Sequence, residues 1–147
     1  MAFFTSEFEC KLDTKGRLVL PAKIKNNLPE VSSNELVLRK GFESNLTLYP
    51  MVEYKKLHHR ISSLSDFNPE QRRLKRMFFK SIAQVELDSA GRILVPKAML
   101  AHAGIEKEAV LVGMGNYIEI WNPETFESET MPDADLYSEL AQKYLDE

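Results

Sequence analysis

A ten-residue sequence with a charged turn occurs twice in this chain. Residues 12–21 read LDTKGRLVLP, and residues 87–96 read LDSAGRILVP. The Asp, Gly, Arg and Pro keep the same mutual spacing in both copies, and apolar residues separate the Arg from the Pro. Such a repeat constrains the architecture strongly, because both copies are expected to form the same local structure. The repeated Arg either stabilises this structure or contacts another molecule.

The similarity between the two halves continues beyond the turn. Each copy is followed by a short helical pattern and then by two apolar strand patterns, ELVLRKG and NLTLYP in the first half and EAVLVGM and YIEIWNP in the second. Each unit therefore reads as strand, turn, strand, short helix, strand, turn, strand. We divide the chain into a first unit (5–51), a basic helical connector (52–79), a second unit (80–126) and an acidic C-terminal helix or tail (127–147).

Glycine and proline mark the boundaries of these elements. Gly16 and Gly91 supply the positive φ that a tight turn between two strands often needs. Pro21 and Pro96 each suit the first position of a helix. Gly104 is expected to end the second of these helices in a left-handed conformation.

The connector contains a strong start signal for its second helix. Asn68 suits the N-cap, Pro69 suits the first helical position, and Gln71 can close a capping box. The spacing of the following apolar residues predicts one buried face. The residues of this face are Leu74, Met77 and Phe78.

Each unit is expected to be only marginally stable by itself. A unit of about 45 residues with four short strands buries too little surface. Two such units in one chain can cover each other's apolar faces. We therefore expect a mainly β fold with peripheral helices (α+β), in which both units build one pseudo-symmetric core.

The repeated motif resembles that of a known family. DTKGRLVLP and DSAGRILVPKAML, each in a four-strand unit, are similar to the swapped-hairpin unit of AbrB-type bacterial transcription factors. Two units joined by a basic helical pair, with GMGNYIEIWNPETF closing the second, resemble the MraZ family of transcriptional regulators from about residue 3 to 126. The resemblance implies a swapped-hairpin β-barrel made of two tandem AbrB-like repeats.

The resemblance also implies a function. It implies a sequence-specific DNA-binding transcriptional regulator of its own cell-division and cell-wall gene cluster. The implied partners are double-stranded DNA, at short direct repeats in the promoter, and other copies of the chain in a ring-shaped homo-oligomer, often an octamer. The implied location is the cytoplasm, in association with the nucleoid.

The resemblance attributes the DNA contacts to the two Asp-x-x-x-Arg loops, chiefly the first. Two features separate the chain from the family pattern: Ala90 stands where the first loop has Lys15, and MAFFTSEF lacks the Gly that usually follows the first Phe. Further lysines make the surface of the first unit cationic. The candidate DNA-binding residues are Arg17, Lys15, Asp13, Arg92, Asp88, Lys11 and Lys23.

The residues alone leave two roles open for each Arg. Arg17 and Arg92 can each pair with the Asp of their own turn and brace the hairpin, which adds little stability at an exposed site. Alternatively, each guanidinium contacts a phosphate or a guanine edge. Both roles can coexist if the Asp orients the guanidinium for its contact.

Charge is distributed unevenly along the chain. The net charge is −3, yet residues 51–80 contain eight Lys and Arg against three Asp and Glu, whereas residues 81–147 contain four against thirteen. The basic connector is either a solvated helical face or a subunit interface for the acidic C-terminal segment of a neighbour. An acidic protein can still bind DNA, because the local field at the binding face attracts the phosphates.

Other classes of function find little support in the sequence. His58 and His59 point in different directions on a helix, His102 is isolated, and no catalytic, metal or nucleotide motif occurs. We expect no enzymatic activity, metal, cofactor or small-molecule substrate. The lack of a long apolar run and of a signal peptide argues against a membrane or secreted protein, and the single cysteine, Cys10, fits the cytosol.

A protein-interaction module is the alternative to a DNA-binding regulator. Antitoxins with a related barrel usually carry a partner-binding tail. Residues 127–147 are acidic and contain one apolar stripe, so they suit such a tail.

Overall fold

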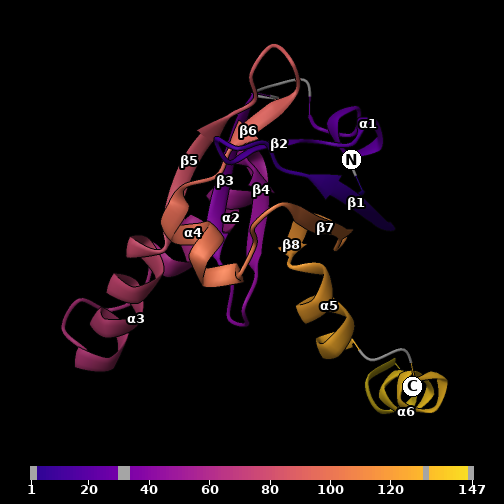
Figure 1. Cartoon of the computed structure of the whole chain (residues 1–147). Helices are drawn as coiled ribbons and strands as arrows, with labels where there is room; N and C mark the ends of the chain where they lie inside the picture. The colour runs from indigo at the N-terminus through magenta and orange to yellow at the C-terminus, as the bar shows by residue number, and fades with distance from the viewer. Residues whose placement is uncertain (1–2, 30–33, 131–132, 146–147) are drawn as a thin grey trace.

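The computed structural model describes residues 3–29, 34–130 and 133–145, in which pairs of strands are separated by one or two helices (Figure 1). The strands are β1 (Glu7–Lys11), β2 (Arg17–Val19), β3 (Glu35–Lys40), β4 (Leu46–Pro50), β5 (Ile82–Glu86), β6 (Arg92–Leu94), β7 (Glu108–Gly113) and β8 (Ile118–Trp121). The helices are α1 (Ala22–Lys25), α2 (Met51–Ser62), α3 (Pro69–Lys80), α4 (Lys97–Ala103), α5 (Pro123–Thr130) and α6 (Ala134–Leu145).

The two units exchange strands within one six-stranded sheet. Its order is β1-β7-β8-β4-β3-β5, and every neighbouring pair is antiparallel. The first strand of each unit pairs in the other unit, β1 with β7 and β5 with β3, while β4 and β8 join the units in the middle. The expected mainly β fold with peripheral helices, built around a core shared by both units, is therefore confirmed.

The barrel implied by the resemblance is not closed. Strands β1 and β5 lie at opposite edges of the six-stranded sheet, and β2 and β6 form a separate two-stranded sheet. This happens because β2 and β6 have only three residues each and pair with one another. Consequently, no strand among the described residues links the edge at β1 to the edge at β5.

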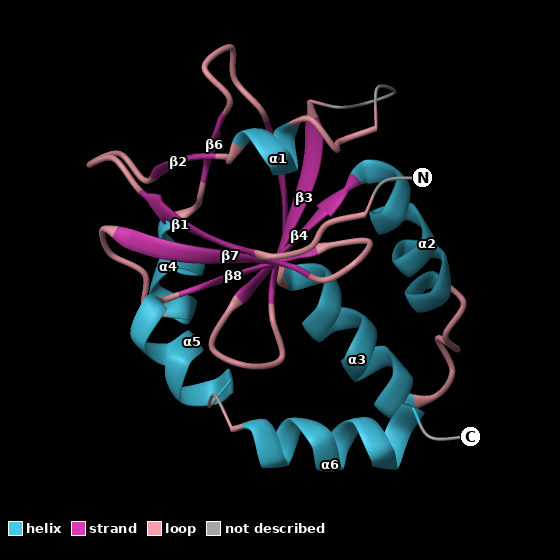
Figure 2. Cartoon of the chain, turned by 90° about the vertical axis from the view of Figure 1, so that its right-hand side faces the viewer, coloured by secondary structure: helices cyan, strands magenta, loops and turns pink. Residues whose placement is uncertain are grey.

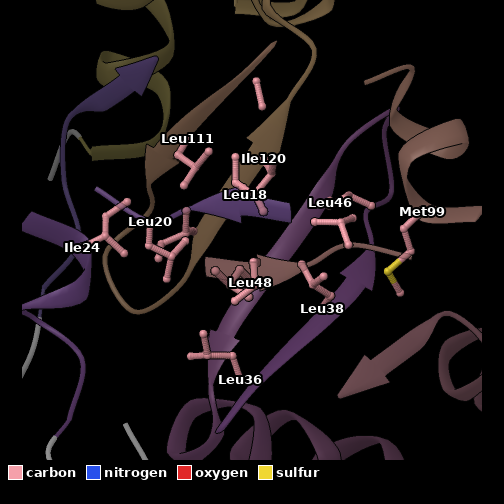
Figure 3. Packing of buried hydrophobic residues seen from close by; sticks show 14 of the residues in the cluster. Leu18, Leu20, Ile24, Leu36, Leu38, Leu46, Leu48, Met99, Leu111 and Ile120 are labelled. Carbon is pink, nitrogen blue, oxygen red and sulfur yellow. The ribbon is translucent and has the colours of Figure 1, made fainter. Parts of the chain in front are cut away.

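The two-stranded sheet, called the ribbon from here on, is anchored to the larger sheet by apolar packing. Leu18 of β2 and Ile93 of β6 have no exposed surface and belong to the main core. Figure 3 shows Leu18 close to Leu111 and Ile120 of the large sheet. Full burial of such a side chain contributes about 1.5–3 kcal/mol. The ribbon is therefore held firmly, and its other face has a defined orientation.

Glycine and proline act largely as the sequence predicts. Gly16, Gly91 and Gly104 have φ angles of 83°, 76° and 64°, which confirms the two turns and the helix end. Pro21 and Pro96 lie at the N-cap of α1 and α4 rather than at the first helical position. Their ψ angles of 147° and 144° are extended, so each helix begins one residue later than predicted.

The start of α3 is confirmed, but its capping box is not. The Asn68 side chain accepts hydrogen bonds from the backbone N–H groups of Glu70 (2.9 Å) and Gln71 (3.1 Å), and Pro69 is the first helical residue. The Gln71 side chain does not return to the N-cap. Its oxygen accepts a hydrogen bond from the backbone N–H of Ser65 at 2.6 Å, which ties the preceding loop to the helix.

The predicted apolar face of α3 is mostly exposed. Phe78 is buried with Val37 and Tyr54, in a small cluster between the connector and the sheet. Leu74 and Met77, however, remain 43% and 59% exposed. The prediction is wrong for these two residues. Phe78, near the end of α3, is the only buried residue of the helix, because only this end packs against the sheet.

The last helix, α6, contacts little of the rest of the chain. In Figures 1 and 2, α5 leads away from the sheet to α6. No described residue of α6 is buried, although the helix carries an apolar stripe. Its exposed large apolar residues are Leu136, Tyr137, Leu140, Tyr144 and Leu145. None of the helices in the described ranges has the length and apolar character needed to cross a membrane.

Candidate nucleic-acid interface

The ribbon places both repeated arginines on one exposed face. Strands β2 and β6 lie side by side (Figure 2), and their register pairs Arg17 with Leu94, Leu18 with Ile93, and Val19 with Arg92. Because side chains alternate along a strand, the buried central pair leaves the other four residues on the outer face. Val19 and Leu94 are 51% and 57% exposed there. The outer face therefore presents two arginines on a diagonal, with an apolar side chain opposite each.

The first loop is a tight turn organised by its aspartate. The backbone N–H of Asp13 donates to the carbonyl of Arg17 (3.0 Å), and the N–H of Gly16 donates to the carbonyl of Asp13 (3.1 Å). The Oδ1 of Asp13 accepts from the backbone N–H groups of Lys15 and Arg17, both at 2.9 Å. The Oδ2 accepts from the Nε of Arg17 at 2.6 Å. One carboxylate thus fixes both the turn and the guanidinium.

The second loop repeats this arrangement. The Oδ1 of Asp88 accepts from the backbone N–H groups of Ala90 (3.0 Å) and Arg92 (2.8 Å). Its Oδ2 accepts from the Nε of Arg92 at 2.9 Å. The backbone hydrogen bonds of the turn also match those of the first loop. The two motifs are therefore equivalent in structure as well as in sequence.

Each arginine braces its hairpin through Nε and keeps its Nη donors free of other hydrogen bonds to the described residues. The side chains of Arg17 and Arg92 are both 31% exposed, and each uses its Nε on the aspartate. In the described ranges, neither guanidinium makes a further hydrogen bond through its two Nη nitrogens. A guanidinium carries five N–H donors, so the ion pair leaves the outer edge available for a second acceptor. The geometry is compatible with both roles that the sequence left open.

Hydrogen bonds lower the pKa of both loop aspartates. For Asp13 the backbone N–H of Arg17 has the largest effect, partial burial opposes it, and the Arg17 guanidinium lowers the pKa further. For Asp88 the backbone N–H and guanidinium of Arg92 have the same effects. Both carboxyl groups are therefore charged at neutral pH and hold their loops in the observed form.

These shifts predict how the stability of the loops depends on pH. The folded-state pKa values lie below the unfolded value of about 3.9, so the stabilisation is complete above that pH and is lost as pH falls through the lowered values. We expect the melting temperature of the wild type to exceed that of the double variant Asp13→Asn, Asp88→Asn by a constant amount between about pH 5 and 8, and by less below about pH 4. Thermal unfolding followed by circular dichroism measures this difference; a loss near pH 6–7 would contradict the assignment.

The remaining candidate residues lie outside the hydrogen-bonded loops, except for Lys15. Lys15 is exposed at the first turn, where its backbone N–H donates to Asp13. Lys11 is exposed on β1, opposite Glu108 of β7, so an acidic residue accompanies its charge. Lys23 lines a hollow beside the N-terminal segment. The structure therefore brings five of the seven candidates together on the ribbon and its loops.

Lys25 lies beside the ribbon but is not among the candidate residues that the sequence predicts. The side chain of Lys25, on α1, lies over Gly91 of the second loop, with its Nζ 3.3 Å from the position that a Cβ of Gly91 would occupy. The two residues are far apart in sequence and meet because the units interlock. An alignment of the two units gives a signal for this position, because Lys25 in the first unit corresponds to Leu100 in the second.

Comparison with known proteins is consistent with this arrangement. The family model described as "MraZ protein, putative antitoxin-like" matches residues 3–77 and 78–143. A transcriptional regulator MraZ of Cytophaga hutchinsonii is 47% identical over 145 residues, covering 99% of this chain and 96% of that protein. Those of Thermomicrobium roseum (40% identical, 86% of each chain) and Heliobacterium modesticaldum (35% identical, 97% of each chain) are also similar. The chain, with its two interlocked units and paired Asp-x-x-x-Arg loops, belongs to the MraZ family.

Proposed function

We propose that this chain is a sequence-specific DNA-binding transcriptional regulator that presents the outer face of the ribbon to double-stranded DNA. The observation that carries the proposal is the placement of Arg17 and Arg92 on one exposed face, each oriented by an aspartate through Nε. The names of the relatives, transcriptional regulators, support the same class of function. No enzymatic step, metal or cofactor is part of the proposal.

A two-stranded ribbon is a suitable shape for reading DNA. The major groove admits such a ribbon, and arginine is the side chain most often found on a guanine edge, where it binds O6 and N7 together. The free Nη nitrogens of Arg17 and Arg92 provide the donors for this contact. Val19 and Leu94, exposed between them, can contact thymine methyl groups. Lys15 at the first turn contacts a phosphate.

The finer proposal concerns the target and the assembly. The target is a set of short direct repeats in the promoter of the chain's own cell-division and cell-wall gene cluster, bound in the cytoplasm at the nucleoid. A ring-shaped homo-oligomer, an octamer, places several ribbons along these repeats. Each ribbon makes few contacts, but the first bound ribbon raises the effective concentration of the next, which increases the overall affinity by orders of magnitude.

Two exposed helical faces supply an interface for the ring. On α6 an apolar stripe lies beside acidic residues, whereas on α3 the exposed Leu74 and Met77 lie beside basic residues. Arg73 precedes Met77 by four residues and Lys80 follows it by three, so both flank Met77 on the helix surface. Docking α6 of one copy on α3 of the next covers both apolar faces and pairs opposite charges.

A mobility-shift titration with DNA from upstream of the chain's own gene tests the function. We expect specific binding that weakens steeply with salt, because each neutralised phosphate contributes about 0.9 to the slope of log K against log salt. A complex that neutralises six or more phosphates loses about 10³-fold in affinity between 50 and 200 mM salt. A duplex of the same composition with scrambled repeats is the control, and equal binding to both duplexes would refute sequence-specific recognition.

The second candidate is a protein-interaction module with little specific DNA binding. The observation that favours it is the uncovered apolar stripe of α6. Deleting residues 127–147 separates the two functions. If the chain is a regulator, the truncated protein still binds a short duplex with one repeat. If it is an interaction module, the wild type shows no preference for the upstream DNA in the first place.

A further inference from the structure

Each loop of the ribbon is covered by the short helix of the other unit. Leu100 of α4 lies over Gly16, with its Cδ1 3.4 Å from the position that a Cβ there would occupy. Lys25 of α1 lies over Gly91, with its Cδ and Nζ 3.5 and 3.3 Å from the corresponding position. The main chain matches as well, because Val95 donates to the carbonyl of Gly16 and Leu20 donates to that of Gly91, both at 3.0 Å. The two loops therefore have equivalent main chains, but the residue that covers each of them differs.

The presence of Lys25 over the second loop compensates for Ala90, which stands where the first loop has Lys15. The first loop has Lys15 at its tip and the apolar Leu100 as its cover. The second has Ala90 at its tip and Lys25 as its cover. Each loop thus has one lysine: Lys15 within the first turn and Lys25 over the second. The first belongs to its own turn, and the second is delivered by the interlocked unit.

The ammonium group of Lys25 is available for a ligand. Lys25 is exposed, and it forms no ion pair with any described residue. Its aliphatic stem lies against Gly91, a buried residue with a φ of 76°. A side chain at residue 91 would strain the turn and crowd the lysine. The second loop therefore leaves room for the stem of Lys25 and leaves its charge uncovered.

We infer that Lys25 is a phosphate-binding residue and that it makes the second loop a DNA contact equivalent to the first. This inference rests on the proposed function of the ribbon. A lysine ammonium binds phosphate as a compact point charge with three donors. Lys15 and Lys25 then bind the phosphate backbone at the two ends of the ribbon, while Arg17 and Arg92 face the groove between them. One chain therefore reads DNA through a nearly two-fold symmetric face.

The variant Lys25→Leu tests this inference, because it gives the second loop the cover that the first loop has by nature. On a short duplex with one repeat, we expect the affinity to fall about fivefold at 0.15 M salt and the salt slope to fall by about 0.9, the contribution of one phosphate. Adding Ala90→Lys to this variant places a lysine at the second tip, as in the first loop. We expect it to restore both the affinity and the slope.

Three controls make the result interpretable. Lys55→Leu removes an exposed lysine of α2 that forms no ion pair with the described residues and lies away from the ribbon, and it is expected to leave the affinity for the short duplex unchanged. Lys25→Gln keeps a long side chain without the charge and is expected to behave as Lys25→Leu. Thermal unfolding of each variant confirms that the fold is retained.

The outcomes separate this inference from the function on which it rests. Wild-type binding by Lys25→Leu, together with weak binding by Arg17→Ala, would refute the role of Lys25 and leave the proposed function intact. Failure of Ala90→Lys to restore binding would also refute it, because the loss would then arise from packing over Gly91. A wild type without specific DNA binding would refute both proposals.

Discussion

Arg17→Ala is expected to abolish binding of the assembled protein to repeated promoter DNA. A bidentate contact between arginine and guanine contributes about 1–3 kcal/mol, so one ribbon loses about 5- to 150-fold in affinity. The loss multiplies when several ribbons bind along the repeats, because each intramolecular step is weakened by the same factor. A mobility-shift titration against a short duplex and a repeated duplex measures the two effects separately.

The fold is expected to survive this substitution. The Arg17 backbone still donates to Asp13, Leu18 stays in the core, and the lost ion pair is exposed. Exposed pairs contribute little to stability, so the melting temperature should change only slightly. Arg17→Lys is the matched variant: it keeps the charge but lacks the planar fork, so it should bind DNA more tightly than Arg17→Ala and still discriminate poorly between bases. Unfolding or disassembly of Arg17→Ala would show that the arginine acts only as a brace.

Arg92→Ala gives the corresponding measurement for the second loop. The resemblance to the family attributes most of the contact to the first loop, whereas the position of Lys25 favours two equivalent loops. A similar loss of affinity for the two alanine variants on the short duplex supports equivalence. Wild-type binding by Arg92→Ala would mean that the second loop only supports the ribbon.

Reversing two charges on α3 is expected to dissociate the proposed ring. In the double variant Arg73→Glu, Lys80→Glu, the acidic side of a neighbouring α6 meets like charges, and such juxtapositions cost several kcal/mol at an interface. Several kcal/mol corresponds to a rise of about 10²–10³-fold or more in the dissociation constant. Size-exclusion chromatography with light scattering should show protomers or dimers at a concentration at which the wild type forms the proposed ring.

A compensating variant distinguishes this interface from a general effect of charge. Asp135→Lys, Glu139→Lys on α6 is expected to dissociate the ring as well, and combining all four substitutions should restore it. Each dissociated variant should still bind a short duplex with one repeat, because the ribbon is unchanged. Rings that persist in both double variants would refute docking of α6 on α3.

Much of the local structure could be predicted from the sequence. The turns at Gly16 and Gly91 and the N-cap at Asn68 were predicted because each depends on the conformational preferences of a few neighbouring residues. The capping box at Gln71 was wrong, since the loop before the helix offers a competing backbone donor at Ser65. The exposure of Leu74 could not be predicted, because apolar spacing identifies an amphipathic face but not its partner.

The candidate site was predicted in part for the same reason. Asp13 and Arg17 lie four residues apart in one turn, so their pairing follows from local geometry. The expectation that the two units share a core also followed, because neither could bury enough surface alone. Both predictions depend on the repeated motif and on the spacing of its residues, which the sequence shows directly.

The sequence by itself thus determined the two hairpin turns and the need for the units to combine. Only the tertiary structure decided that β2 pairs with β6, so that Arg17 and Arg92 share one face, and that Lys25 covers the loop of the other unit. The physical reason is that strand pairing and burial act between residues distant in sequence. Leu18 and Ile93 pair with one another and are both buried in the shared core, so the four flanking side chains face outward, including the equally apolar Val19 and Leu94.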